Sequence, residues 1–361
     1  MKGYIKRLDL YIIKKFLGTF FYAIMILAII ACVIDYSEKV EEFVKKNVPT
    51  SEILSYFSNF VPHITALLFP LFIFIATIFF TSKLAYKSEI IAILSSGVSF
   101  QRLLRPYLMA GGFLCLLSLI ANHYLVPAAN SKRIAFEDKY LHYNAQSSDN
   151  NVHLRLTENL YVFIQNYDYA SNFGYRFTAE TIEGTHMKEK IMADRVSYDS
   201  VKHIWKLYGV KIRTNDSLNE TFIQQAEMEK KFPFTPHDLD EDEAIKDALT
   251  TPELNKYIAR EELRGRETLS FFYVEKYRRT AQPFAGLILT VIGACIASRK
   301  IRGGSGVHLA FGIVISAMYI MAMQLTNTFA TKAGLDPLLA VWIPNIIFGI
   351  VATYLFIRQV K

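Results

Sequence analysis

Chemically specialised residues are scarce in this sequence. Only three cysteines occur in 361 residues, and all three, Cys32, Cys115 and Cys295, lie inside apolar runs. Such cysteines are expected to pack as small apolar side chains, so they indicate neither a disulfide framework nor a metal site. The patterns G-x-x-x-x-G-K-S/T, H-E-x-x-H and G-x-S-x-G are also missing. We therefore predict no catalytic residue, no metal site and no cofactor bound directly by the chain.

Charge is also absent from long parts of the chain. Charged residues make up 20% of the sequence and hydrophobic residues 52%. The uncharged runs are residues 16–34, 53–82, 106–131, 280–298, 303–331 and 337–357. Because about 20 helical residues cross the hydrocarbon core of a bilayer, every run is long enough to span it. We predict six transmembrane helices in a 3+3 arrangement, and the lack of Asp and Glu inside them argues against coupling to a proton or sodium gradient.

The distribution of Lys and Arg predicts the orientation. With a cytoplasmic N-terminus, fourteen of them fall in inside segments and four in the short outside loops, as membrane proteins prefer. Both termini are then cytoplasmic and the interval 132–279 is external. The net charge of +7 is spread beside the apolar runs, so a nucleic-acid partner is not expected. The predicted domains are residues 1–131, 132–270 and 271–361.

The N-terminus has a second interpretation. The segment I-I-A-C at 29–32 resembles a lipoprotein signal, in which Cys32 is lipidated and the preceding residues are removed. Removing the first run would invert the count that makes the charge asymmetry consistent. We therefore favour a retained first helix.

The external interval contains strand patterns. Apolar and β-branched residues alternate or cluster at 160–164, 175–181 and 204–208, and polar turns separate them. Trp205 and Leu207 are predicted to share one face. This spacing predicts an inserted antiparallel β-domain, a jelly roll or sandwich. The acidic segment 238–243 follows; its spacing lacks the glycine and terminal glutamate of an EF-hand, so a solvated linker is favoured over a cation site. Thr251-Pro252-Glu253 then predicts the start of a short amphipathic helix.

Two polar positions in or near the spans have both a structural and a functional interpretation. His63, directly after Pro62, is either a proton relay or a partner in an interhelical hydrogen bond, and we favour the hydrogen bond. Glu275 and Arg279 are four residues apart, which favours an ion pair within one helix. In a complex of two such chains the pair would instead bridge subunits.

Helical spacing groups residues in the fourth and fifth spans. Tyr319, Met323 and Asn327 share one side of the fifth helix and are predicted either to line a substrate path or, as we favour, to make helix contacts. A stripe of small residues in the fourth helix predicts close helix packing: Gly286, Thr290, Gly293, Ala294 and Ala297.

A short cytoplasmic segment, residues 88–97, lies between the second and third spans. Ser88 is predicted as its N-cap and Gly97 as its stop. Ile90, Ile93 and Leu94 form one face, whereas Glu89 and Ser96 lie on the other. Spacing alone leaves two interpretations open, a helix that presents Glu89 to a partner and an interfacial helix with a solvated glutamate.

The order of several motifs resolves this choice. They are the helix after the second span, A-D-R-V-S-Y-D at 193–199 before W-K-L at 205–207, T-P-E-L-N-K-Y-I at 251–258, E-K-Y-R-R-T-A-Q-P-F at 275–284, R-G-G-S-G at 302–306 and L-D-P-L-L-A-V-W-I-P-N at 335–345. Together they resemble the LptF/LptG family of lipopolysaccharide-export permeases over essentially the whole chain. L-D-L-Y-I at 8–12 leans towards LptG. Structural roles are expected for Trp205, Glu275, Arg279, Pro283, Trp342 and Pro344.

The resemblance implies a machine of several subunits. Two related six-span permeases pair in the inner membrane, and an LptB-like ATPase dimer in the cytoplasm uses ATP and Mg. The short cytoplasmic helix is then the coupling helix, with Glu89 docked in a groove of the ATPase beside Ile90, Ile93, Ser96 and Gly97. Lipopolysaccharide enters between the first and fifth helices and passes across the periplasmic jelly roll to an LptC/LptA-like bridge.

The sequence departs from the family pattern at the predicted outer end of the first helix. The resemblance leads us to expect basic residues there for substrate phosphates, and Lys39, Lys45 and Lys46 are the candidates. Four acidic residues accompany them: Asp35, Glu38, Glu41 and Glu42. Attraction and repulsion then oppose each other, and an amphipathic surface helix is the alternative. For the whole chain, the alternative is a membrane-anchored envelope scaffold or sensor whose β-domain binds a ligand without transport.

Overall fold

The computed structural model describes residues 6–141, 149–168, 171–184, 186–200, 202–216, 219–236, 245–264, 269–299 and 304–360. It divides the chain into two compact units. The helical unit comprises Met1–Phe136, Lys246–Pro252 and Ser270–Lys361, and the β-unit comprises Glu137–Ile245 and Glu253–Leu269. The acidic segment 238–243 lies outside the described residues, so its interpretation as a linker stays a prediction.

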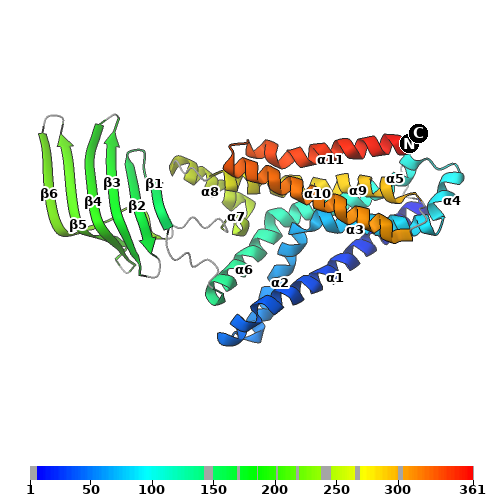
Figure 1. Ribbon diagram of the computed structural model, residues 1–361, viewed down its shortest axis with the longest axis horizontal. Helices are drawn as coiled ribbons and strands as arrows, with labels where there is room; N and C mark the ends of the chain where they lie inside the picture. Colours follow the sequence, from blue (N-terminus) through cyan, green and yellow to red (C-terminus); the bar gives the residue numbers. More distant parts are fainter. Residues whose placement is uncertain are drawn as a thin grey trace. The chain divides into compact units, whose positions relative to one another are not determined.

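The described helices are α1 (Arg7–Lys45), α2 (Thr50–Leu67), α3 (Phe69–Tyr86), α4 (Glu89–Ser95), α5 (Phe100–Ile120), the π-helical turn η1 (Ala121–Leu125), α6 (Val126–Tyr140), α7 (Ile245–Ala248), α8 (Thr251–Arg264), α9 (Ser270–Ala297), α10 (Gly304–Lys332) and α11 (Pro337–Val360). All the helices except α8 belong wholly or mainly to the helical unit, whereas most of α8 lies in the β-unit (Figure 1). Six helical stretches of the described chain are long and apolar enough to cross a membrane: Arg7–Lys45, Phe69–Tyr86, Phe100–Tyr140, Ser270–Ala297, Gly306–Lys332 and Pro337–Gln359. The predicted set of six spans is confirmed.

The second uncharged run forms two helices rather than one. The helix breaks at Leu68, two residues before Pro70. Proline has no N–H to donate to the carbonyl four residues earlier, and its ring crowds that carbonyl. In this chain the carbonyl belongs to Ala66, and Gln282 Nε2 of α9 donates to its oxygen at 2.7 Å. A side chain of α9 therefore supplies the hydrogen bond that the proline removes.

Helix α9 is the centre of the helical unit. It packs against α3, α5, α10 and α11. A Cβ atom at Gly286 would stand 2.7 Å from the Phe69 ring, and one at Gly293 would stand 3.0 Å from Thr77 Cγ2. These glycines let α3 approach α9 closely, as the small-residue stripe predicts. Helix α1, by contrast, leaves the bundle along its length and meets α2 at its far end (Figure 1).

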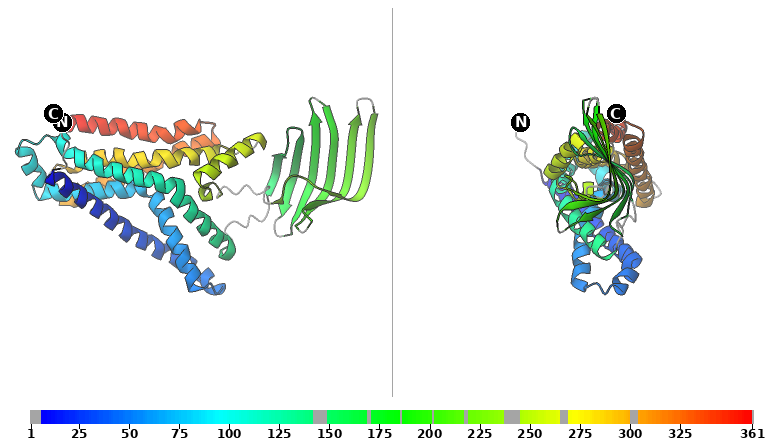
Figure 2. Two further views of the ribbon diagram at one scale, coloured as in Figure 1. Left: turned by 180° about the vertical axis from the view of Figure 1, so that it is seen from behind. Right: turned by 90° about the vertical axis from the view of Figure 1, so that its left-hand side faces the viewer.

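The β-unit contains one six-stranded antiparallel sheet (Figure 2). Its strands are β1 (Asp149–Arg155), β2 (Leu160–Asp168), β3 (Phe173–Glu183), β4 (His186–Asp199), β5 (Ile204–Asp216) and β6 (Asn219–Lys230). Each strand pairs with its neighbour in sequence, so the sheet is a meander. The inserted antiparallel domain is thus confirmed, and its topology is simpler than the Greek-key order of a jelly roll.

Trp205 lies at the centre of the β-unit core. Trp205 and Leu207 are both fully buried, as the alternation in β5 predicts. The chain after β6 folds back over this face, where the Phe234 ring stacks on Trp205 with 4.6 Å between centroids. Trp205 Nε1 donates to the Phe234 carbonyl oxygen at 2.9 Å, so the indole N–H is satisfied within the core.

Candidate functional site

Helix α4 is the short helix that the sequence predicts between the second and third spans. It occupies Glu89–Ser95, and Gly97 follows it with a φ of +87°, the left-handed conformation expected at a helix stop. The Gly97 N–H donates to the Leu94 carbonyl oxygen at 3.1 Å. Ser88 stands at the N-cap position but has a φ of +59°, and its side chain does not cap the helix. The expected side-chain cap is therefore wrong, whereas the helix and its stop are confirmed.

The two faces of α4 have different surroundings. Ile90 is 1% exposed and belongs to the apolar core of the helical unit, and Ile93 packs at the edge of that core. Ile91 is 47% exposed and Leu94 37% exposed. Leu94 therefore does not share the buried face, and an apolar surface beside Glu89 stays open. Such a surface suits a partner or the membrane interface.

Glu89 has one neighbour that the sequence did not reveal. The Tyr11 hydroxyl of α1 donates to Glu89 Oε2 at 3.1 Å. Nearby, the Arg102 guanidinium of α5 donates to both carboxylate oxygens of Asp9 in α1. The only sequence signal for these contacts is a set of polar residues beside the ends of three uncharged runs. The coupling residues Glu89, Ile90, Ile93, Ser96 and Gly97 lie together on α4 and its end, and their role in docking stays a prediction.

The three candidate lysines for substrate phosphates all have carboxylate partners on the same helix. Lys39 is 8% exposed, and its Nζ donates to Asp35 Oδ1 at 2.7 Å and also contacts the Tyr56 hydroxyl of α2. Lys45 Nζ lies 2.8 Å from Glu41 Oε1. Lys46 Nζ lies 4.0 Å from Glu42 Oε2. Lys39 therefore joins α1 to α2, and only Lys45 and Lys46 project enough to meet a soluble anion.

Tyr319, Met323 and Asn327 lie along one side of α10. Tyr319 and Met323 are buried, and the Tyr319 hydroxyl donates to Asn345 Oδ1 of α11 at 2.9 Å. Asn345 Nδ2 in turn donates to the Ala281 carbonyl oxygen of α9 at 2.8 Å. These contacts support the packing interpretation for Tyr319 and Met323. Asn327 Oδ1 is buried without a hydrogen-bond partner. Of these three residues, Asn327 is therefore the one that stays a candidate for the substrate path.

Three positions assigned structural roles, Pro283, Trp342 and Pro344, lie in α9 and α11. Pro283 is buried inside α9, and Pro344 lies inside α11. The Trp342 ring of α11 lies 5.7 Å from that of Phe284, between centroids. Their packing agrees with the structural assignment.

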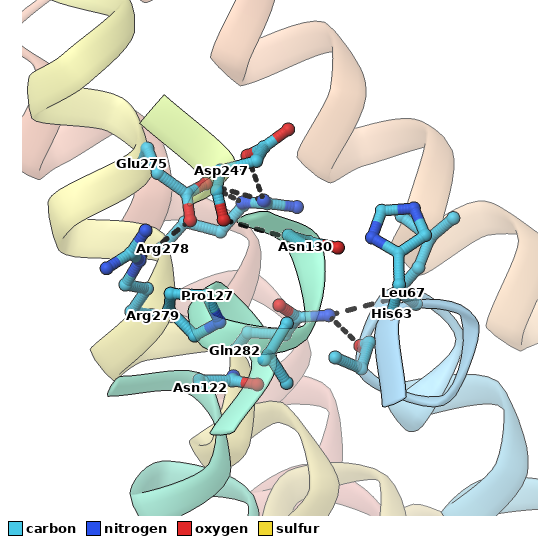
Figure 3. Close-up of a pocket in the computed structure, with 12 residues that line it drawn as sticks. His63, Leu67, Asn122, Pro127, Asn130, Asp247, Glu275, Arg278, Arg279 and Gln282 are labelled. Atoms are coloured by element: carbon cyan, nitrogen blue, oxygen red, sulfur yellow. Dashed lines mark hydrogen bonds and ion pairs between the residues drawn. The ribbon is translucent and has the colours of Figure 1, made fainter. Parts of the chain in front are cut away.

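A small polar cavity of about 40 Å³ lies in the helical unit (Figure 3). Glu275 and Arg279, both buried, line it and form the predicted i,i+4 pair, with Arg279 Nε 2.8 Å from Glu275 Oε1. Arg278 Nε donates to the other carboxylate oxygen, Oε2, at 2.8 Å. His63 faces the same cavity from α2. The cavity has room for a few water molecules and not for a lipid.

This polar cluster holds the short segment that contains α7. Arg279 Nη2 donates to the Lys246 carbonyl oxygen at 2.8 Å, and Asn130 Nδ2 of α6 donates to the Asp247 carbonyl oxygen at 3.2 Å. Arg278 lies 3.6 Å from Asp247 Oδ1, and burial raises the pKa of the Asp247 carboxyl. Sequence spacing predicted the Glu275–Arg279 pair but not these distant partners. The contacts of Glu275 with Arg278 and Arg279 support a structural role for the Glu275–Arg279 pair.

The comparison with known families now decides the class of protein. The model of a family described as "Lipopolysaccharide export system permease LptF/LptG" matches residues 10–358. This chain belongs to the LptF/LptG family. The match spans all six membrane helices and the β-unit, so the chain is a permease of lipopolysaccharide export and not an enzyme. The family model covers LptF and LptG together, and the leaning towards LptG stays a prediction. No curated protein matches the chain.

Proposed function

We propose that this LptF/LptG-family chain is one permease subunit of an ATP-driven exporter that extracts lipopolysaccharide from the inner membrane. Both termini face the cytoplasm and the β-unit faces the periplasm, as the asymmetry of Lys and Arg predicts. The observation that carries the proposal is the family match over residues 10–358. It agrees with six candidate spans and an inserted antiparallel sheet.

The energy for export comes from a separate subunit in this proposal. The sequence contains no nucleotide-binding lysine pattern, so ATP and Mg are bound by a cytoplasmic, LptB-like ATPase dimer. The ATPase docks on α4, where Glu89 stands beside the exposed Ile91 and Leu94. A second six-span permease of the family completes the membrane part. An LptC/LptA-like periplasmic bridge accepts the lipid from the β-unit.

Glu89→Lys tests this proposal. In a partly desolvated groove Glu89 would meet a cationic side chain, and truncating one member of such a pair costs about 2–5 kcal/mol of binding free energy. Glu89→Ala should therefore bind the ATPase more weakly, and Glu89→Lys should be worse because like charges then face each other. Binding and lipopolysaccharide release are measured in vesicles that contain the purified chain and its copurifying ATPase.

The matched control is Glu158→Lys, which makes the same charge change at an exposed position of the β-unit. It should leave ATPase binding unchanged. Normal binding and release in Glu89→Lys would remove Glu89 from the coupling surface. Purification of the wild-type chain without an ATPase or a second permease would favour the scaffold or sensor alternative.

A further inference from the structure

A buried ion pair fastens the start of α1 to the start of α5. The Asp9 carboxylate is 4% exposed and accepts hydrogen bonds from Arg102 Nη1 and Nη2, each at 2.6 Å. The same carboxylate accepts the Lys6 backbone N–H at 2.9 Å, which fixes its orientation. Two parallel bonds between a guanidinium and a carboxylate are strong and geometrically specific. Arg102 therefore connects the first turn of α5, which follows α4 in the chain, to α1.

A second contact connects the first residue of α4 to α1. The Tyr11 hydroxyl donates to Glu89 Oε2 at 3.1 Å, and Glu89 is the first residue of α4. Between the two contacts, Ile90 belongs to the same buried apolar cluster as Ile12 and Phe16 of α1. The first turns of α1 and the loop from α4 to α5 are thus one packed body.

Between its first turns and its far end, where Lys39 contacts Tyr56 of α2, α1 makes few contacts. In its most apolar stretch only 11% of the residues are buried, compared with 72% in α3. Because energetic coupling travels through packed side chains and polar contacts, the attachment to α4 and to the start of α5 is the route by which a movement of α4 reaches the start of α1.

We propose that Asp9 and Tyr11 attach the start of α1 to the start of α5 and to α4, so that a movement of α4 under a docked ATPase is transmitted to α1. In this arrangement Tyr11 also positions the Glu89 carboxylate, and Arg102 positions Asp9. None of the three touches substrate. The inference rests on the proposed function, because it requires an ATPase that docks on α4.

A charge exchange tests the Asp9–Arg102 attachment. Asp9→Arg, Arg102→Asp and the double exchange are prepared in the full chain, purified with its ATPase and placed in vesicles that contain lipopolysaccharide. Bound ATPase, ATP hydrolysis and lipid release are measured. Each single variant should keep the ATPase but release about tenfold less lipid per ATP, within the usual range of coupling energies. The double exchange should restore much of the loss, since it remakes the pair.

Tyr11→Phe provides a variant that keeps the fold, because it removes only the hydroxyl. It should lower lipid release per ATP about fivefold with little change in thermal stability. The control uses an exposed position of the same helix. Tyr22 is 62% exposed, and Tyr22→Phe should have no effect.

The outcomes separate this inference from the proposed function. Wild-type release per ATP in Tyr11→Phe and in both single exchanges would overturn the inference and leave the proposed function intact. A double exchange as defective as its single variants would also overturn it. If the wild-type chain binds no ATPase, the proposed function fails, and the inference fails with it.

Discussion

The β-unit and the helical unit are held together by different kinds of contact. The core of the β-unit is apolar and is built around Trp205, whose indole N–H donates to the Phe234 carbonyl oxygen. The helical unit instead contains a buried ionic cluster around Glu275 and Arg279. Water outside a β-domain drives apolar side chains inward, but lipid tails are as apolar as the helices themselves. Close packing and polar contacts must therefore order the helices.

The largest expected effect is in the apolar core. Trp205→Ala removes a fully buried side chain that contacts Tyr167, Tyr198 and Phe234, and the cavity should cost about 3–5 kcal/mol of unfolding free energy. The measurement is cooperative unfolding of segment 132–270 by circular dichroism. Tyr175→Ala is the control, because the Tyr175 side chain of β3 is 42% exposed. An unchanged melting curve for Trp205→Ala would show that the sheet is not organised around this residue.

A smaller effect is expected in the ionic cluster. Arg279→Met leaves Glu275 with Arg278 as its remaining partner and frees the Lys246 carbonyl. An unsatisfied buried polar group costs about 1–3 kcal/mol, so the melting temperature of the detergent-solubilised chain should fall. Arg105→Met, at an exposed position of α5, should have no such effect. Equal melting temperatures in the two variants would contradict the view that polar contacts order this unit.

The sequence predicts features that depend on local periodicity. Lipid imposes a minimum length on each span, so the six apolar runs could be found by counting. The alternation around Trp205 placed it in the core, and four-residue spacing found the Glu275–Arg279 pair. These predictions need only the geometry of a helix or a strand.

Features that depend on tertiary contacts could not be predicted from the sequence. The break at Leu68 is stabilised by Gln282, which comes from another helix far along the chain. Asp9 and Arg102 are 93 residues apart, and nothing in their separate surroundings indicates that they meet. Periodicity groups Leu94 with Ile90 on one face of α4, but Leu94 is 37% exposed and Ile90 is 1% exposed, because periodicity gives the angle between side chains and not the direction of the core.

The smallest expected effect concerns the C-terminal end of α1, where a contact with substrate phosphates stays a prediction. Lys45 and Lys46 are paired with Glu41 and Glu42 but project from the helix, so they attract an anion only weakly. Changing both lysines to Met should therefore lower lipopolysaccharide release a few-fold at low salt. The effect should shrink as salt increases, because exposed charges are screened beyond about 10 Å at 0.1 M.

The matched variant removes the opposing charges. Glu41→Gln with Glu42→Gln leaves both lysines unpaired and should raise release at low salt, if substrate phosphates pass this end of α1. Lys39→Met is a separate case, because Lys39 is buried against Asp35 and Tyr56, and its loss should lower thermal stability. Release that is the same in the lysine and the glutamate variants at low salt would take Lys45 and Lys46 off the substrate path. The acidic residues that accompany them would then mark an ordinary solvated surface of the helix.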